Sequence, residues 1–217
     1  MVVAPHPDDE SLGCGGTLLR HRDAGDETHW LIATAMQPNG EFDAARIAAR
    51  EQEIDQVAAR YGFASVTRLD HPTAGLDIVP RAQLVGEFAE TLASITPDTL
   101  YLPHRGDAHS DHRITFDAAA AAAKPFRAPY LARILSYEVA SETDAAPASS
   151  PRFDPAVFVD ISHYLDDKVS VVEMYAGETG AFPFPRSARA IRALAQLRGS
   201  QSGYEAAEAY MLLRERR

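Results

Sequence analysis

The sequence predicts an α/β protein with a Rossmann-like, doubly wound, mostly parallel sheet flanked by helices. Through residues 1–140, short apolar runs alternate with longer amphipathic segments, as they do in successive βαβ units. The chain has 217 residues, 46% of them hydrophobic and 24% charged, which is enough for one sizeable core. We therefore expect a single domain over residues 1–217, with a core over 1–140 and an extension over 156–217.

The elements of the core follow from the hydrophobic pattern in order along the chain. Strands are predicted at the short apolar runs Val2–Ala4, Thr28–Thr34, Ser65–Leu69, Thr99–Leu102 and Arg133–Val139. Helices are predicted at the segments Ser11–Ala24, Phe42–Tyr61, Pro80–Ile95 and His109–Lys124. Gly62 and Pro97 end the second and third helices, because glycine favours the helix C-terminus and proline cannot continue a helix.

The extension begins after Ser141–Pro155, which is rich in Ala, Ser, Pro and Asp and predicts a long surface loop. Beyond this loop we predict a strand at Val157–Ile161, followed by helices at Tyr164–Tyr175, Ser187–Leu197 and Tyr204–Arg214. The segment Gly177–Pro185 contains too much Gly and Pro for regular structure and is a candidate lid.

Composition argues against several classes of function. The net charge is −10 and no long Lys/Arg run occurs, so a nucleic-acid partner is not expected. Apolar stretches fall well short of the ~20 residues of a membrane span. With no leader pattern before the first strand and a single Cys14, which cannot form an intramolecular disulfide, we expect a cytoplasmic protein. Assembly into a homo-oligomer stays open.

Two polar clusters follow predicted strands. His6–Glu10 comes directly after the first strand, and Asp107–His112 follows the fourth. In a doubly wound sheet ligands bind outside the carboxyl ends of the strands, so the fold is expected to bring the clusters together. His6, Asp9 and His112 can then supply the three ligands that a catalytic zinc usually takes, with one position left for a water whose pKa falls toward ~7.

Neighbouring residues have candidate roles in the same chemistry. Asp8 is predicted to be the general base. His109 lies one helical turn from His112 and, as an imidazolium, is expected to stabilise an oxyanion or protonate a leaving amine. Asp111 is a candidate partner that orients one of the histidines, and His104 is a further candidate behind the ligands.

Contacts to a substrate are less closely defined by the pattern. Arg50 and Arg105 either bind substrate hydroxyl or phosphate groups or pair with neighbouring acids. Asp107 is assigned to substrate binding with them, and Arg186 is a candidate because it follows the proposed lid. Specificity is expected in the irregular loops Met36–Asp43, His71–Ile78 and Gly177–Arg186.

The motif His6–Glu10 together with His109–His112 resembles the LmbE-like, or PIG-L, family of zinc-dependent N-acetylglucosaminyl deacetylases. Members remove acetyl or other acyl groups from amino sugars and their conjugates. Arg50-Glu51-Gln52-Glu53 resembles the Arg/Glu-bearing helix of the family, and the order of elements to about residue 140 fits its Rossmann-like sheet.

The resemblance implies that His6, Asp9 and His112 bind zinc and that Asp8 is the base. It also implies that His109 acts on the tetrahedral intermediate, with Asp111 tuning it, and that Arg50 helps to hold the sugar. Some members that act on sugar-thiol precursors carry a Tyr where this chain has Asp107, so we do not assume such a substrate.

The predicted function is a zinc amidase acting on an N-acetylated amino sugar or its conjugate, with Fe²⁺ or another divalent ion possible. One alternative is a non-haem iron oxygenase, because two histidines and a carboxylate also form its facial triad. Another is a catalytically inactive sugar- or nucleotide-binding module whose metal only shapes a pocket.

The remaining polar and glycine-rich patterns are interpreted as structural. Gly13–Gly16 lacks the spacing of a dinucleotide loop and predicts close helix packing. Isolated imidazoles are more often hydrogen-bonded than metal-bound, which applies to His21, His29, His71 and His163. Asp166–Lys168 is interpreted as a solvated helix face.

Overall fold

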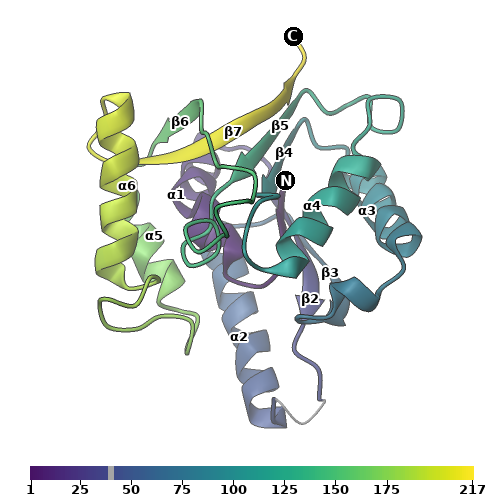
Figure 1. Cartoon of the computed structure of the whole chain (residues 1–217), viewed down its shortest axis with the longest axis horizontal. Coiled ribbons are helices and arrows are strands. Elements are labelled where there is room, and N and C mark those ends of the chain that lie inside the picture. Colours follow the sequence, from purple (N-terminus) through teal and green to yellow (C-terminus); the bar gives the residue numbers. More distant parts are fainter. Residues whose placement is uncertain (39–41) are drawn as a thin grey trace.

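The computed structural model describes residues 1–38 and 42–217 and contains one seven-stranded sheet in the order β3-β2-β1-β4-β5-β7-β6 (Figure 1). The strands are β1 Val2–Ala4, β2 His29–Ala35, β3 Ser65–Pro72, β4 Thr99–Pro103, β5 Arg133–Tyr137, β6 Val157–Asp160 and β7 Ala207–Glu215. Strands β1 to β5 pair in parallel, whereas β7 is antiparallel to both of its neighbours. The predicted fold class is confirmed.

The helices form a layer on each face of the sheet. They are α1 Asp9–Ala24, α2 Ala44–Tyr61, α3 Arg81–Ile95, α4 Ser110–Ala122, α5 Leu165–Val172 and α6 Ala188–Ser202, with a 3₁₀ turn at Leu76–Ile78. Alternate residues of a strand point to opposite faces, so Val2 and Ala4 pack with α1 and α2 while Val3 packs with α3 and α4. Figure 1 shows these two layers on either side of the sheet.

Glycines allow helix α1 to pack closely against β5 and the residue that follows β6. A Cβ atom at Gly13 would come within 2.2 Å of Tyr137 Cδ2, and one at Gly16 within 2.6 Å of Ile161 Cγ2. Only glycine permits this approach, so the predicted packing role of Gly13–Gly16 is confirmed. The approach fixes the position of the first turn of α1, which carries the first polar cluster.

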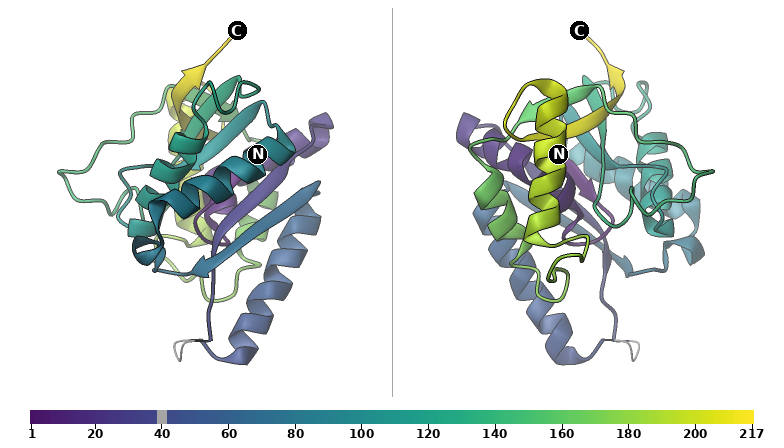
Figure 2. Two further views of the ribbon diagram at one scale, coloured as in Figure 1. Left: turned by 90° about the vertical axis from the view of Figure 1, so that its right-hand side faces the viewer. Right: turned by 60° about the vertical axis from the view of Figure 1, so that its left-hand side comes forward.

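The last predicted helix, Tyr204–Arg214, is wrong, because most of it belongs to strand β7, Ala207–Glu215. The segment is rich in strong helix formers, namely Ala, Glu, Met, Leu and Arg, and the helix was predicted from this local propensity. In the structure β7 lies between β5 and β6 and takes its backbone hydrogen bonds from both, which outweighs local propensity. The loop before the extension is irregular as predicted, and Figure 2 shows it projecting from the body of the molecule.

The predicted solvated helix face at Asp166–Lys168 is wrong for Lys168. Its side chain is buried, and Nζ lies 2.6 Å from Glu208 Oε1 and 2.8 Å from the Leu12 carbonyl oxygen. Glu208 in turn accepts hydrogen bonds from the backbone N–H groups of Gly16 and Thr17, each at 2.8 Å. Both members of this buried ion pair belong to the extension, and their hydrogen bonds to the backbone of α1 join the two parts of the chain.

Every helix within residues 1–38 and 42–217 is too short or too polar to cross a lipid bilayer.

Candidate metal centre and cleft

The two polar clusters meet at the carboxyl ends of the adjacent strands β1 and β4. The chain leaves β1 at Ala4 and enters α1 at Asp9, and it leaves β4 at Pro103 and enters α4 at Ser110. From β1 the sheet continues to β2 on one side and to β4 on the other, which makes this the topological switch point of the sheet. The fold therefore positions both clusters where a ligand is expected.

His6, Asp9 and His112 come together around one point. Each offers a ligand atom within 4.8 Å of the other two. Asp9 Oδ2 lies 3.4 Å from His6 Nδ1 and 3.3 Å from His112 Nε2. Ligand atoms about 2.0–2.2 Å from a common tetrahedral zinc ion lie roughly 3.3–3.5 Å apart. The imidazole and carboxylate donors therefore fit a divalent ion in both chemistry and spacing.

Each of these histidines has a carboxylate at its other ring nitrogen. His6 Nε2 lies 3.0 Å from Asp111 Oδ2, and His112 Nδ1 lies 2.8 Å from Asp107 Oδ2. Such partners fix the ring orientation and tautomer of a metal-binding histidine. Asp111 is itself held by the backbone N–H groups of Ala74 and Leu76, which brings part of the predicted loop His71–Ile78 behind the centre.

Asp111 contacts a histidine as expected, but that histidine is His6 and not the His109 that the resemblance implied, and Asp107 lies elsewhere than the sequence assigned it. The Asp111 carboxylate contacts His6, and only its backbone N–H reaches His109, at 3.1 Å from Nδ1. The Asp107 side chain is fully enclosed between His112 and the Thr143 hydroxyl, which donates to Oδ1 at 2.6 Å. Asp107 thus faces the protein interior and not the cleft to which the sequence assigned it.

The pKa values of His6, His112 and His109 are shifted in different directions by their surroundings. Burial alone would lower the pKa of His6 and His112, but hydrogen bonds and charge from Asp9, Asp111 and Asp107 raise these pKa values to about 9 for His6 and about 10 for His112. For His109, burial and the neighbouring His6 lower the pKa to about 4. In the metal-free protein His109 is therefore neutral near pH 7 and not the expected imidazolium.

Asp8 is buried beside the ligands in a backbone conformation that L-residues rarely adopt, with φ at 138°. Its N–H donates to Glu10 Oε2 at 3.1 Å, and Tyr175 Oη donates to Glu10 Oε1 at 2.7 Å. Arg186 Nη1 donates to Asp8 Oδ2 at 2.7 Å. Burial and Asp9 raise the pKa of Asp8, whereas Arg186 opposes that shift. The arginine named from sequence as a substrate contact thus binds Asp8.

A cleft of about 210 Å³ opens beside this centre, between α2 and the segment 177–186, and His6, Asp8 and His109 line it. Arg50 also lines it, but its guanidinium donates to the Pro7 carbonyl oxygen at 2.7 Å, lies 3.0 Å from Glu53 Oε2 and pairs with Glu178. Glu178 in turn lies 3.2 Å from Arg186. Sequence reasoning missed Glu178, for which membership of the candidate lid was the only signal.

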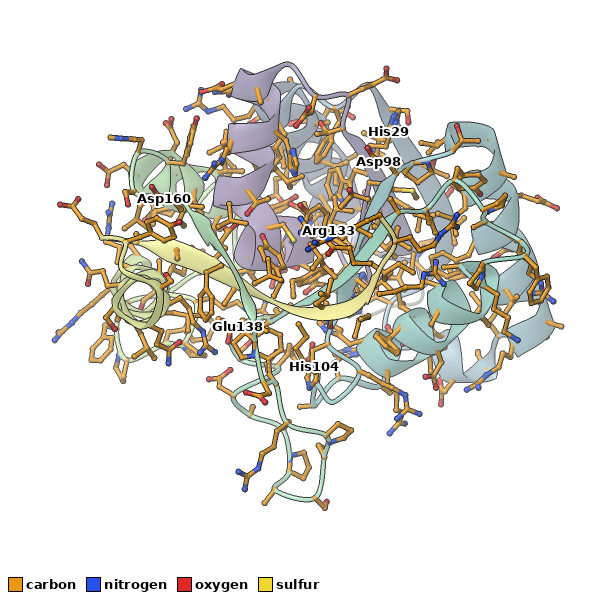
Figure 3. All side chains as sticks on the ribbon, turned by 90° about the horizontal axis from the view of Figure 1, so that it is seen from above. His29, Asp98, His104, Arg133, Glu138 and Asp160 are labelled. Carbon is orange, nitrogen blue, oxygen red and sulfur yellow. The ribbon has the colours of Figure 1, made fainter. Side chains whose placement is uncertain are left out.

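Other predicted residues are not brought to the centre. Arg105 is half-exposed and pairs with Asp117 at 2.7 Å. His104 lies beside the loop of residues 141–155, with Nε2 at 3.0 Å from the Pro151 carbonyl oxygen, and Figure 3 shows its position.

Three of the isolated histidines form hydrogen bonds away from the candidate metal centre. His21, His29 and His71 each contact a polar side chain, as predicted. The predicted specificity loop Met36–Asp43 falls partly outside the described residues.

Comparison with known proteins adds independent information. The family model of PIG-L, described as GlcNAc-PI de-N-acetylase, matches residues 1–123. Diacetylchitobiose deacetylase from Thermococcus kodakarensis is 25% identical over 222 residues, covering 96% of this chain and 80% of the relative.

Solved structures share the fold. N,N'-diacetylchitobiose deacetylase from Pyrococcus horikoshii superimposes with a TM-score of 0.79 at 20% identity, covering 98% of this chain and 82% of that one. GalB, the 4-carboxy-2-hydroxymuconate hydratase from Pseudomonas putida, gives 0.77 at 18% identity, covering 100% and 96%. One fold thus carries different reactions, so the reaction must be argued from the site.

Proposed function

Because the chain belongs to the PIG-L family of GlcNAc-PI de-N-acetylases, we propose that it is a metal-dependent amidase acting on an N-acetylated amino sugar or its conjugate. It would release acetate, or a similar acyl group, and leave a free amine. The observation that carries this proposal is the convergence of His6, Asp9 and His112 on one point beside Asp8. We further propose that residues 1–217 act as one domain, since β6 and β7 continue the same sheet.

In this proposal His6 Nδ1, Asp9 and His112 Nε2 hold a divalent ion, Zn²⁺ in the first instance. The ion supplies Lewis acidity, which polarises a carbonyl group and lowers the pKa of water. Asp107 and Asp111 keep the two imidazoles in the tautomer that presents the correct nitrogen. A site built for an iron oxygenase would share these ligands, and the relatives' deacetylase names favour the amidase.

Asp8 is proposed as the proton carrier. Arg186 holds its Oδ2 atom, which leaves Oδ1 to accept a proton from the attacking water. The same carboxyl group can then deliver that proton to the nitrogen of the departing amine. The constrained backbone at Asp8 fixes the direction of the carboxylate, so little reorganisation is needed when the proton moves.

His109 is proposed to stabilise the developing oxyanion as a neutral hydrogen-bond donor. Its Nδ1 accepts the Asp111 backbone N–H, so in the neutral ring the proton lies on Nε2. Because His109 lines the cleft, that N–H is available to a substrate carbonyl oxygen. Arg50 donates hydrogen bonds from Nη1 to the Pro7 carbonyl oxygen and from Nη2 to Glu178, and its Nε lies 3.0 Å from Glu53 Oε2. We propose that Arg50 supports the Pro7 turn more than it binds the sugar.

The test compares Asp8→Asn with His112→Ala in purified protein. Asp8→Asn is expected to keep its metal but to lose turnover by about 10²–10⁴-fold, since general-base catalysis contributes on that order. His112→Ala should lose metal. Acetate release across a panel of N-acetylated amino sugars and bound metal are measured, with Asp166→Asn as a surface control. Full activity in Asp8→Asn, or no acetate from any substrate at any metal loading, contradicts the proposal.

A further inference from the structure

The described lining of the cleft contains three guanidinium groups, and each is already paired with carboxylates. Arg68 forms ion pairs with Glu51 and with Asp55, the latter at 3.2 Å. Arg50 is held by two glutamates, and Arg186 by Asp8 at 2.7 Å and Glu178 at 3.2 Å. A guanidinium that is committed in this way offers few donors to an incoming anion.

Carboxylates outnumber guanidiniums along the described lining of the cleft. Beyond the acids already paired, Asp70 lies in β3, two residues before its last residue Pro72, and forms no ion pair within residues 1–38 and 42–217. Glu142 approaches Arg186 only at 3.4 Å. The charge that a substrate meets outside the metal centre is therefore negative, and a partly enclosed cleft strengthens that field.

The helix N-termini at the cleft do not offset this excess of negative charge. Backbone N–H groups at a helix start commonly bind phosphate. At α1 the first turn carries Asp9 and Glu10, and Glu10 accepts the Asp8 N–H. At α4 the Asp111 N–H donates to His109. Among the described residues, these donors are occupied by the chain's own side chains.

We propose that the cleft selects N-acylated amino sugars whose remaining part is uncharged or cationic, and that it discriminates against conjugates carrying a phosphate. The inference rests on the proposed function and narrows its substrate class. Neutral oligosaccharides fit this class, and so do partly deacetylated ones, whose free amines are cations. Nucleotide-linked and phospholipid-linked amino sugars do not. Glu51 is a specificity-determining residue in this scheme, because it neutralises Arg68.

The first experiment compares kcat/KM for acetate release from the methyl glycoside of N-acetylglucosamine with that from its 6-phosphate. The neutral glycoside should be favoured by at least about tenfold at low ionic strength, with a smaller gap near 0.5 M salt because salt screens the repulsion. A mono-deacetylated disaccharide should react at least as well as its fully acetylated parent.

The second experiment frees the Arg68 guanidinium from its ion pair with Glu51 by substituting Glu51. Glu51→Gln leaves Arg68 with Asp55 alone, so the ratio of kcat/KM for the phosphate over the neutral substrate should rise roughly fivefold. Asp166→Asn removes the same charge from an exposed site paired with Arg192 and should leave that ratio unchanged.

Calorimetric binding of the two product amines, methyl glucosaminide and its 6-phosphate, separates this inference from the proposed function. Preferred binding of the unphosphorylated amine without any acetate release would overturn the function and support the charge selectivity. Equal use of both substrates, or a ratio unmoved in Glu51→Gln, would overturn the selectivity while the amidase stands.

Discussion

Asp107 offers a direct test of the proposed metal site. Its Oδ2 atom lies 2.8 Å from His112 Nδ1, and its side chain has no exposed surface. Asp107→Ala removes a hydrogen bond to a charged group, which is worth about 1.5–3 kcal/mol. His112 then becomes a weaker ligand with an unfixed tautomer. We expect metal affinity to fall about 10–100-fold, or roughly 1.4–2.7 kcal/mol.

Competition with a chelator at fixed pH measures this loss. Asp107→Asn keeps the shape of the side chain, and with its amide oxygen turned to His112 Nδ1 its NH₂ group can donate to the Thr143 hydroxyl, so it should fall between wild type and Asp107→Ala. Asp117→Asn is the matched control, because Asp117 lies on the same helix α4 but pairs with Arg105 away from the centre. At saturating metal, KM for an amino-sugar substrate should stay near the wild-type value.

The opposite pattern would refute the structural reasoning. If Asp107 contacted the substrate, as its position in the sequence motif suggested, both variants would raise KM and leave metal affinity unchanged. That outcome would require the loop between β4 and α4 to turn outward, with His112 oriented by some other group.

Two further predictions concern the buried charges. Glu208→Leu should lower the free energy of unfolding by about 3–5 kcal/mol, because it leaves the Lys168 ammonium buried without its partner. In urea unfolding, the double variant Glu208→Leu/Lys168→Met should show a much smaller loss of stability. Equal losses in the single and double variants would argue against a stabilising ion pair. Since the pKa values of His6 and His112 are raised to about 9 and about 10, both rings are protonated near pH 7 without metal and must lose those protons to bind it. Metal binding at pH 7 should release about two protons and strengthen as pH rises toward 9, and titration heats that do not depend on the buffer's ionisation enthalpy would contradict this.

The convergence of the two polar clusters was predictable because it follows from topology. His6–Glu10 and Asp107–His112 each follow a strand of a parallel sheet, and the carboxyl ends of β1 and β4 are adjacent. No exact register was needed to infer that the two clusters meet. The doubly wound core was predictable for the same reason, since the alternation of apolar and amphipathic runs is a local signal.

What sequence could not supply depends on tertiary partners. The Arg186–Asp8 contact joins residues 178 positions apart, and no local pattern marks either the contact or the burial of Lys168. Strand β7 has the composition of a helix, and it is a strand because it pairs with both β5 and β6 in the sheet. The direction of the Asp107 side chain likewise depends on a single turn before α4.

The position of β7 has a consequence for biosynthesis. This strand inserts between β5 and β6, yet residues 138–206 are translated between β5 and β7. At about 5–20 residues per second, the nascent protein would expose one unpaired edge of β5 for on the order of 3–14 s. During that interval α1 also lacks the Glu208 clamp on its backbone. Loss of ribosome-associated chaperones that shield open sheet edges should therefore lower the yield of this folded protein. The loss should be larger than for a protein whose strands are synthesised in the order in which they lie in the sheet.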